Sequence, residues 1–326
     1  MTVAVQTSQT SQATAHAVVF VADHKSLAES MGAALAEHTN DPAAFAAALR
    51  SAFGSLADPL YLEGQRRVAP GIGRPHGVRW PLITAVARGF RRVTRRDRPT
   101  PLLFIADRLL REPELEALWF AFDLLARTIT AEPERSWQLL RRASREAADW
   151  ITVDSLAHPV GAGVALEPFR WAELEQLVFS PSRWERRLVG SAIATMVHGR
   201  GMPGRDAALV SHAIPLLEQL MGDAEPDVQK ALSWAWRSLA DIDRETVTTA
   251  LREETELAAR TDDGHRAWVI RDSLTKLDPT AAAELRERLD GIRRRTGAPS
   301  TSSAAALAAR FGALPDPRVH PEPPLA

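Results

Sequence analysis

Apolar residues recur at three- and four-residue spacing along most of this chain, and this limits the fold more than any other feature of the sequence. Leu174, Leu177 and Val178 form one such group, and residues 232–239 carry another, in which Trp236 shares the apolar stripe. This is the period of an α-helix, and the alternation that is typical of strands is missing. The sequence therefore predicts an all-α protein with roughly a dozen helices.

Helix starts are marked by residues that satisfy the free N–H groups of a first turn. Ser182 and Glu185 have the spacing of a capping box. An acidic cap followed by a first-turn proline occurs three times, at Asp41-Pro42, Asp58-Pro59 and Asp278-Pro279. These signals predict that new helices begin at these four places.

The C-terminal half carries a weak repeat. Helix pairs are expected to start near Ser182, Pro226 and Gly264, about 40 residues apart, which is the spacing of HEAT repeats. Such pairs stack into an α-solenoid with a concave face. A concave face lined by arginine could hold duplex DNA, but the period is also typical of a scaffold that binds other proteins.

Composition divides the chain into three parts. Residues 1–20 are polar and are interpreted as a disordered leader, and residues 21–297 as one HEAT-like repeat domain. Residues 298–326 are rich in proline and alanine and are interpreted as a mobile tail, with one short helix over 304–311. Gly199 to Gly204 has the composition of a helix–helix loop.

Several classes of protein are excluded or disfavoured. The 326 residues contain no cysteine, so there is no disulfide framework and no thiolate chemistry. No apolar run is long enough for a membrane span, and the first residues do not resemble a signal peptide. There is no phosphate loop, dinucleotide fingerprint or metal-ligand spacing. We therefore expect a cytoplasmic bacterial monomer that acts without a cofactor or metal.

Positive charge is concentrated in one segment although the net charge of the chain is −1. The segment from Glu63 to Arg98 contains ten arginines and only two acidic residues, with the two end residues counted. Arginine binds phosphate through a planar fork and stacks on bases, so this segment favours nucleic acid as the partner. An ordinary solvated helix face is the alternative.

Three short motifs could carry chemistry. In the first, Trp150 and Asp154 are separated by one helical turn and share a face. Asp154 could form an acid/base pair with His158, and the alternative is that it caps the helix that runs toward His158. In the second, Arg183 and Arg187 share a face, which favours a phosphate between them, while pairing with carboxylates of a neighbouring helix is the alternative.

The third motif places Trp234 on one face with Lys230 and Arg237. An indole between two cations suits a cleft that stacks on a ligand or recognises a cation. A tryptophan half-buried between repeats is the alternative, since the chain has nine tryptophans.

Taken in order, these motifs resemble the AlkD-like DNA alkylation repair glycosylases, over roughly residues 55 to 290. The matching stretches are Trp-x-x-x-Asp at 150–154, Trp-x-x-Arg at 184–187 and Lys-Ala-x-x-Trp-x-x-Arg at 230–237. Upstream, Gly71-Ile-Gly-Arg-Pro75 followed by Arg79 is similar to a further segment of that family.

The resemblance implies a concave, cationic surface that grips duplex DNA and excises N3- and N7-alkylated purines. It makes Asp154 the catalytic carboxylate, with Trp150 and Trp234 against the deoxyribose of the lesion. Arg187 would hold a phosphate, and Arg183, Lys230, Arg237 and Arg79 are further candidates for DNA binding. Tyr61 is a weak candidate for an N-terminal aromatic contact. A non-catalytic DNA-binding relative and a HEAT-type scaffold remain the alternatives.

Overall fold

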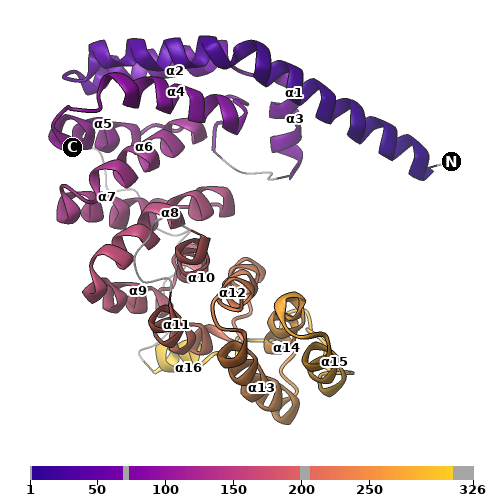
Figure 1. Cartoon of the computed structure of the whole chain (residues 1–326). Coiled ribbons are helices and arrows are strands. Elements are labelled where there is room, and N and C mark those ends of the chain that lie inside the picture. The colour runs from indigo at the N-terminus through magenta and orange to yellow at the C-terminus, as the bar shows by residue number, and fades with distance from the viewer. Residues whose placement is uncertain (1, 69–72, 199–205, 311–326) are drawn as a thin grey trace. The chain divides into compact units, whose positions relative to one another are not determined.

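The computed structural model describes residues 2–68, 73–198 and 206–310, and this part of the chain is built from helices (Figure 1). It contains sixteen α-helices, three short 3-10 helices and no strand, apart from two isolated bridges, Ala57 to Val78 and Arg74 to Glu114. The predicted all-α fold of HEAT-like repeats is confirmed. The chain divides into two compact units, residues 1–139 and 140–326.

The first unit contains six helices and the start of a seventh. They are α1 (Thr2–Ala34), α2 (Pro42–Ser55), α3 (Pro59–Val68), α4 (Trp80–Val93), α5 (Pro99–Leu109), α6 (Leu115–Thr128) and α7 (Pro133–Glu146), with the 3-10 helix η1 (Leu35–His38) after α1. Its core includes the rings of Phe45, Phe90 and Phe120, which contact one another at centroid distances of 5.3 to 6.0 Å.

Helix α1 includes the segment that the sequence analysis interpreted as a disordered leader. The helix runs without interruption from Thr2 to Ala34, so no element ends near residue 20. Neither proline nor glycine occurs between residues 2 and 31, and the chain therefore has no helix breaker there. Further along, Gly32 of α1 and Gly89 of α4 let the two backbones approach closely, because a Cβ on either would overlap a carbonyl of the other helix.

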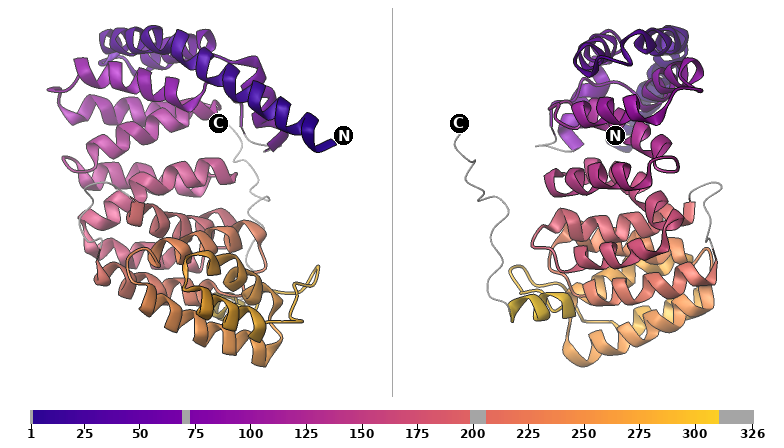
Figure 2. Two further views of the ribbon diagram at one scale, coloured as in Figure 1. Left: turned by 45° about the vertical axis from the view of Figure 1, so that its right-hand side comes forward. Right: turned by 90° about the vertical axis from the view of Figure 1, so that its left-hand side faces the viewer.

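The second unit arranges its helices in two layers (Figure 2). The first layer contains α8 (Trp150–Leu166), α10 (Arg183–His198), α12 (Pro226–Leu239) and α14 (Gly264–Ser273), each in contact with the next. The second layer contains α9 (Trp171–Val178), α11 (Ala207–Leu220), α13 (Arg244–Thr261) and α15 (Pro279–Arg288). Two 3-10 helices, η2 (Pro168–Arg170) and η3 (Leu274–Lys276), complete the connections.

The starts of the first-layer helices confirm the predicted period. Helices α10, α12 and α14 begin within one residue of Ser182, Pro226 and Gly264. The three acidic caps are also confirmed, since the side chains of Asp41, Asp58 and Asp278 accept hydrogen bonds from first-turn N–H groups. Ser182 accepts from Trp184, but Glu185 accepts from the hydroxyl of Ser180, so the reciprocal half of the expected capping box is not formed.

Helices α10 and α12 pack through the smallest side chains. A Cβ on Gly190 would lie 2.8 Å from the carbonyl carbon and oxygen of Ala231, which is closer than atoms can approach. Gly190 therefore lets α10 contact the backbone of α12 directly, and the two helices are held as one block.

The chain after α15 folds back onto the second unit. The backbone N–H of Thr301 donates to the carbonyl of Gly222 at 2.9 Å, and the short helix α16 (Ser303–Ala309) contacts α11. Residues 298–310, which the sequence analysis placed in a mobile tail, are thus docked, and α16 lies close to the short helix expected there. Residues 311–326 and the expected loop at 199–204 lie outside the described part of the chain. Within the described residues, no helix has the length and apolar character that crossing a membrane requires.

Candidate active site

The first two predicted residues lie on α8, and Asp149 determines where that helix begins. The Asp149 carboxylate accepts from the N–H of Thr152 at 2.8 Å and from its hydroxyl at 2.7 Å. Asp149 is therefore the cap, and the alternative that Asp154 caps the helix is wrong. Trp150 is the first residue of α8 and is 38% exposed, and Asp154 follows in the second turn.

The Asp154 carboxylate is held by two side chains of α10. Arg187 donates from Nε to Oδ1 at 3.0 Å and from Nη2 to Oδ2 at 2.7 Å, and the Ser191 hydroxyl donates to Oδ1 at 2.7 Å. The carboxylate is the acceptor in all three bonds, and a carboxylate has about four acceptor positions. Its side chain is 24% exposed. Among the described residues, Oδ2 receives only the Arg187 bond, so one lone pair remains for a water molecule or a ligand.

Arg187 is the centre of this arrangement. Its Nη1 donates to the backbone carbonyl of Asp227 at 2.6 Å, so all three guanidinium nitrogens are engaged and α8, α10 and α12 are tied together. The Arg187 side chain is only 6% exposed. The geometry brings Arg187 and Asp154 together, and it gives the guanidinium a carboxylate partner where the sequence suggested a phosphate.

Arg183, one turn before Arg187, lies nearer the surface. It is 3.4 Å from the Glu225 carboxylate, and its guanidinium carbon lies 4.6 Å from the Trp184 ring centroid. Both arginines of the second motif therefore pair with carboxylates of neighbouring helices, which is the alternative left open by the sequence.

Helix α12 carries the third motif. Trp236 is fully buried, as predicted, while Trp234 is half-buried and Lys230 is exposed. No carboxylate lies within ion-pair distance of Lys230 in the described chain. Arg237 donates to the carboxylate of Asp272 on α14 at 2.6 Å.

Asp272 is a second constrained carboxylate that the sequence analysis did not single out. It accepts from the Ser233 hydroxyl at 2.6 Å as well as from Arg237. Burial acts to raise the pKa of Asp272, but these hydrogen bonds outweigh it, and the pKa lies below its usual value. The signal was present in the sequence, because Trp268 and Asp272 repeat the spacing of Trp150 and Asp154.

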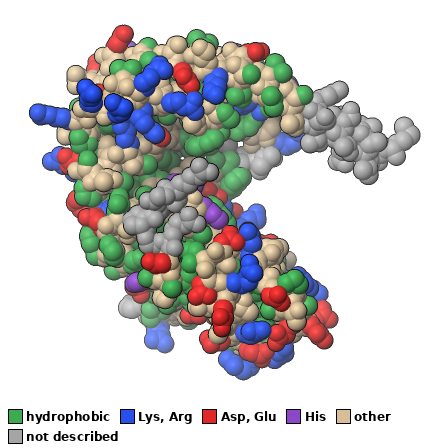
Figure 3. Space-filling view, viewed as in Figure 1, with side chains coloured by type: hydrophobic (Ala, Val, Ile, Leu, Met, Phe, Trp, Pro, Cys, Tyr) green, Lys and Arg blue, Asp and Glu red, His purple; other side chains and the backbone are tan. Residues whose placement is uncertain are grey.

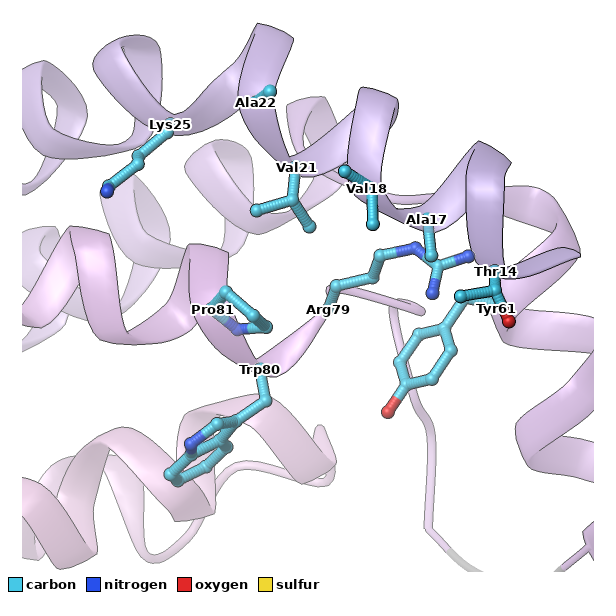
Figure 4. A pocket seen from close by; sticks show the side chains of 10 residues that line it. All are labelled: Thr14, Ala17, Val18, Val21, Ala22, Lys25, Tyr61, Arg79, Trp80 and Pro81. Carbon is cyan, nitrogen blue, oxygen red and sulfur yellow. The ribbon is translucent and has the colours of Figure 1, made fainter. Parts of the chain in front are cut away.

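In the first unit, Arg79 lines an apolar pocket (Figure 4). Its Nε donates to the buried Asp58 at 2.7 Å, and its guanidinium lies 4.9 Å from the Tyr61 ring centroid. The cavity has a volume of about 580 Å³, and Trp80 and Lys25 also line it. Arg79 and Tyr61 are thus brought together within this unit, and α1 forms the opposite wall.

Half of the ten clustered arginines are compensated by nearby carboxylates. Arg67, Arg79, Arg88, Arg91 and Arg92 each lie within 4.0 Å of one. The described chain offers no such partner to the other five, which are Arg66, Arg74, Arg95, Arg96 and Arg98. Figure 3 shows basic side chains gathered over the first unit and mixed with acidic ones over the second. The described residues also include no cluster of three or more histidine or acidic side chains suited to a metal ion.

Comparison with known proteins identifies a family for this chain. A search of curated proteins gives no match. The family model described as DNA alkylation repair enzyme matches residues 49–277, a range that covers most of the described chain and every predicted site residue. The protein therefore belongs to the DNA alkylation repair enzyme family.

Proposed function

We propose that the protein is a monofunctional DNA glycosylase that hydrolyses the N-glycosidic bond of N3- and N7-alkylated purines in duplex DNA. The observation that carries the proposal is the Asp154 carboxylate, oriented by Arg187 and Ser191, one helical turn from the exposed indole of Trp150. Membership of a DNA alkylation repair family supports the same reaction class.

The chemistry suits a site with one carboxylate and no second acid. An N7-alkylated purine carries a positive charge and leaves as a neutral base, so its departure needs no proton. The C1′–N bond breaks first, and the sugar becomes oxocarbenium-like. Asp154 stabilises that charge, and the free lone pair of Oδ2 accepts a hydrogen bond from the attacking water. The oxygen of that water bonds to C1′, and its proton passes to solvent.

Two indoles would favour the cationic sugar over the neutral product. Trp150 is exposed on α8, and Trp234 is half-buried on α12 of the same layer. The face of an indole attracts a cation, and the effect is stronger where water is excluded. We assign both residues to the deoxyribose of the lesion.

Arg187 is assigned here to the orientation of Asp154. Its burial and its three engaged nitrogens make it part of the protein framework, although the resemblance implied a phosphate ligand. A bidentate pair fixes the carboxylate plane before substrate arrives, and such preorganisation is the usual source of electrostatic catalysis.

We assign the grip on the duplex to cationic side chains of each unit, Lys230, Arg237 and Arg183 in the second and Arg79 in the first. Lys230 is exposed, and the three arginine side chains are partly accessible. The protein would act as a monomer on DNA in the bacterial cytoplasm. An open surface site of this kind would also accept bulky adducts, because no closed cavity has to enclose the base.

The test is release of 7-methylguanine from a duplex with one such lesion, detected by alkaline cleavage at the abasic site. We expect Asp154→Asn to bind DNA and to lose about 100-fold or more of the release rate. Asp272→Asn is the matched control, since it removes a carboxylate held by an arginine and a serine of the same layer, and it should retain release.

Other outcomes favour the alternatives. Equal release by wild type and Asp154→Asn would remove Asp154 from the reaction. Salt-sensitive DNA binding without release of this base or of a bulky adduct would indicate a non-catalytic relative. The absence of both DNA binding and base release would favour the alternative that the protein is a HEAT-type scaffold for other proteins.

A further inference from the structure

The segment that follows α15 is fixed against the first layer of the second unit. The Arg271 guanidinium donates to the carbonyl of Ile292 at 2.7 Å, and His265 donates from Nε2 to the carbonyl of Ala298 at 3.2 Å. Thr301 donates to the carbonyl of Gly222, in the turn before α12, and to the carboxylate of Asp263, which caps α14. Residues 289–302 therefore present their side chains at defined positions.

Three successive arginines in this segment have different partners. Arg293 pairs with Asp290 at 3.5 Å, and Arg295 pairs with Asp262. No carboxylate of the described chain lies within 4.0 Å of the Arg294 guanidinium. Its Nη1 donates to the side-chain oxygen of Gln229 at 2.8 Å, and its guanidinium carbon lies 4.6 Å from the ring centroid of Trp268. The charge of Arg294 is thus positioned without being neutralised.

Gln229 is a buried residue that fixes the position of this arginine. Its side chain is fully buried, and its amide nitrogen donates to the carbonyl of Asp223 and, at 3.1 Å, to Nδ1 of His265. Both donors of the amide are used in the interior, so its oxygen faces Arg294. A buried glutamine with every group engaged holds the guanidinium in one orientation.

Helix α12 contributes to both this site and the proposed active site. Gln229 lies two residues after Asp227, whose carbonyl accepts from Arg187, the partner of Asp154. Lys230 is next in sequence and is a second exposed cation without a carboxylate partner among the described residues.

We propose that Arg294, stacked on Trp268, binds a backbone phosphate of the duplex that carries the lesion, with exposed Lys230 of α12 as a second cation. With Nη1 on Gln229 and one face on the indole, Nε and Nη2 remain to form a fork with phosphate oxygens. This inference rests on the proposed function, which supplies the duplex. Residue 294 lies beyond the family match at 49–277.

The experiment compares Arg294→Gln with Arg293→Gln in the full-length protein. The control makes the same charge change one residue away, on an arginine that is already paired. Affinity for a short undamaged duplex is measured by fluorescence anisotropy over a range of salt concentrations. We expect Arg294→Gln to weaken binding about tenfold at low salt and to reduce the slope of log K against log salt by about one, with Arg293→Gln near wild type. Arg294→Lys retains the charge and should retain most of the slope.

The outcomes separate this inference from the proposed function. If wild type releases 7-methylguanine and Arg294→Gln shows the wild-type salt dependence of binding, the proposed glycosylase function is supported and the proposed Arg294 contact is wrong. If wild type shows neither release nor salt-dependent binding, both proposals are wrong. Equal losses in Arg294→Gln and Arg293→Gln would indicate general charge attraction and would also overturn the specific site.

Discussion

The carboxylate of Asp154 and the guanidinium of Arg187 form a bidentate ion pair between α8 and α10, although the residues are 33 positions apart in sequence. The pair joins the motif that supplies the candidate catalytic group to the motif that was expected to hold a phosphate. Arg187 could orient Asp154 or bind a phosphate. The first role affects the rate of base release, and the second affects the salt dependence of DNA binding.

Arg187→Gln should lower base release more than it lowers DNA binding. Loss of the fork lets the Asp154 carboxylate turn, and a displacement of about 1 Å in a reacting group can cost about 100-fold in rate. The salt dependence of binding should stay at the wild-type slope. A reduced slope with normal release of bound substrate would return Arg187 to the role of phosphate ligand.

Replacement by alanine should reduce stability at Trp236 and slow base release at Trp150. Trp236 is fully buried, so Trp236→Ala should reduce the free energy of unfolding by about 3 to 5 kcal/mol. Trp150 is exposed, and Trp150→Ala should slow base release at least about tenfold with little change in stability. Urea unfolding and single-turnover release check the two effects, and unimpaired release by Trp150→Ala would contradict its assigned contact.

Gly190→Ala tests the close contact of α10 with α12. The added Cβ would meet the backbone of Ala231 at 2.8 Å, and we expect a loss of about 1 to 3 kcal/mol in the free energy of unfolding. Gly54→Ala in α2 is the control, because its Cβ would meet no atom within 4 Å. That change should stabilise the protein by about 0.5 to 1 kcal/mol, since alanine favours helix. Equal effects of the two substitutions would mean that α10 and α12 are not in contact at Gly190.

Asp58 should make stability depend on pH in the acid range. Burial acts to raise the pKa of Asp58, but bonds from Arg79 and from the N–H groups of Leu60 and Tyr61 outweigh it and lower the pKa. A lowered pKa in the folded state gives stability that is present above the pKa of the unfolded chain and is lost as pH falls through the folded value. Wild type should therefore lose stability below about pH 4.

Asp58→Asn should cost about 3 kcal/mol near neutral pH, because it leaves the partly buried Arg79 without its carboxylate. The variant should also have a shallower decline in stability at acid pH than wild type. Urea unfolding at several pH values measures both, and parallel declines in the two proteins would show that Asp58 is not the group that titrates.

Local signals allowed much of the fold to be predicted from the sequence. The acidic caps at Asp41, Asp58 and Asp278 depend only on neighbouring residues, and the burial of Trp236 follows from its place in the helical period. Each of these features is decided within one or two helical turns, so single-sequence reasoning reaches it.

The features that were missed depend on contacts between distant parts of the chain. The partner of Arg187 is set by how α8 packs on α10, and spacing within one helix carries no information about it. The docking of residues 298–310 likewise depends on the turn at Gly222, nearly eighty residues earlier. Asp272 is different, because its spacing from Trp268 can be seen in the sequence.

The two-layer arrangement of the second unit has a practical consequence for engineering. The catalytic candidates and the DNA-binding candidates of this unit lie on α8, α10, α12 and the segment after α15, whereas α9, α11, α13 and α15 contribute none of them. Surface positions on those second-layer helices are therefore suitable attachment points for a fluorophore or an immobilising tag. A labelled protein of this kind could report lesions in DNA without alteration of the chemistry that detects them.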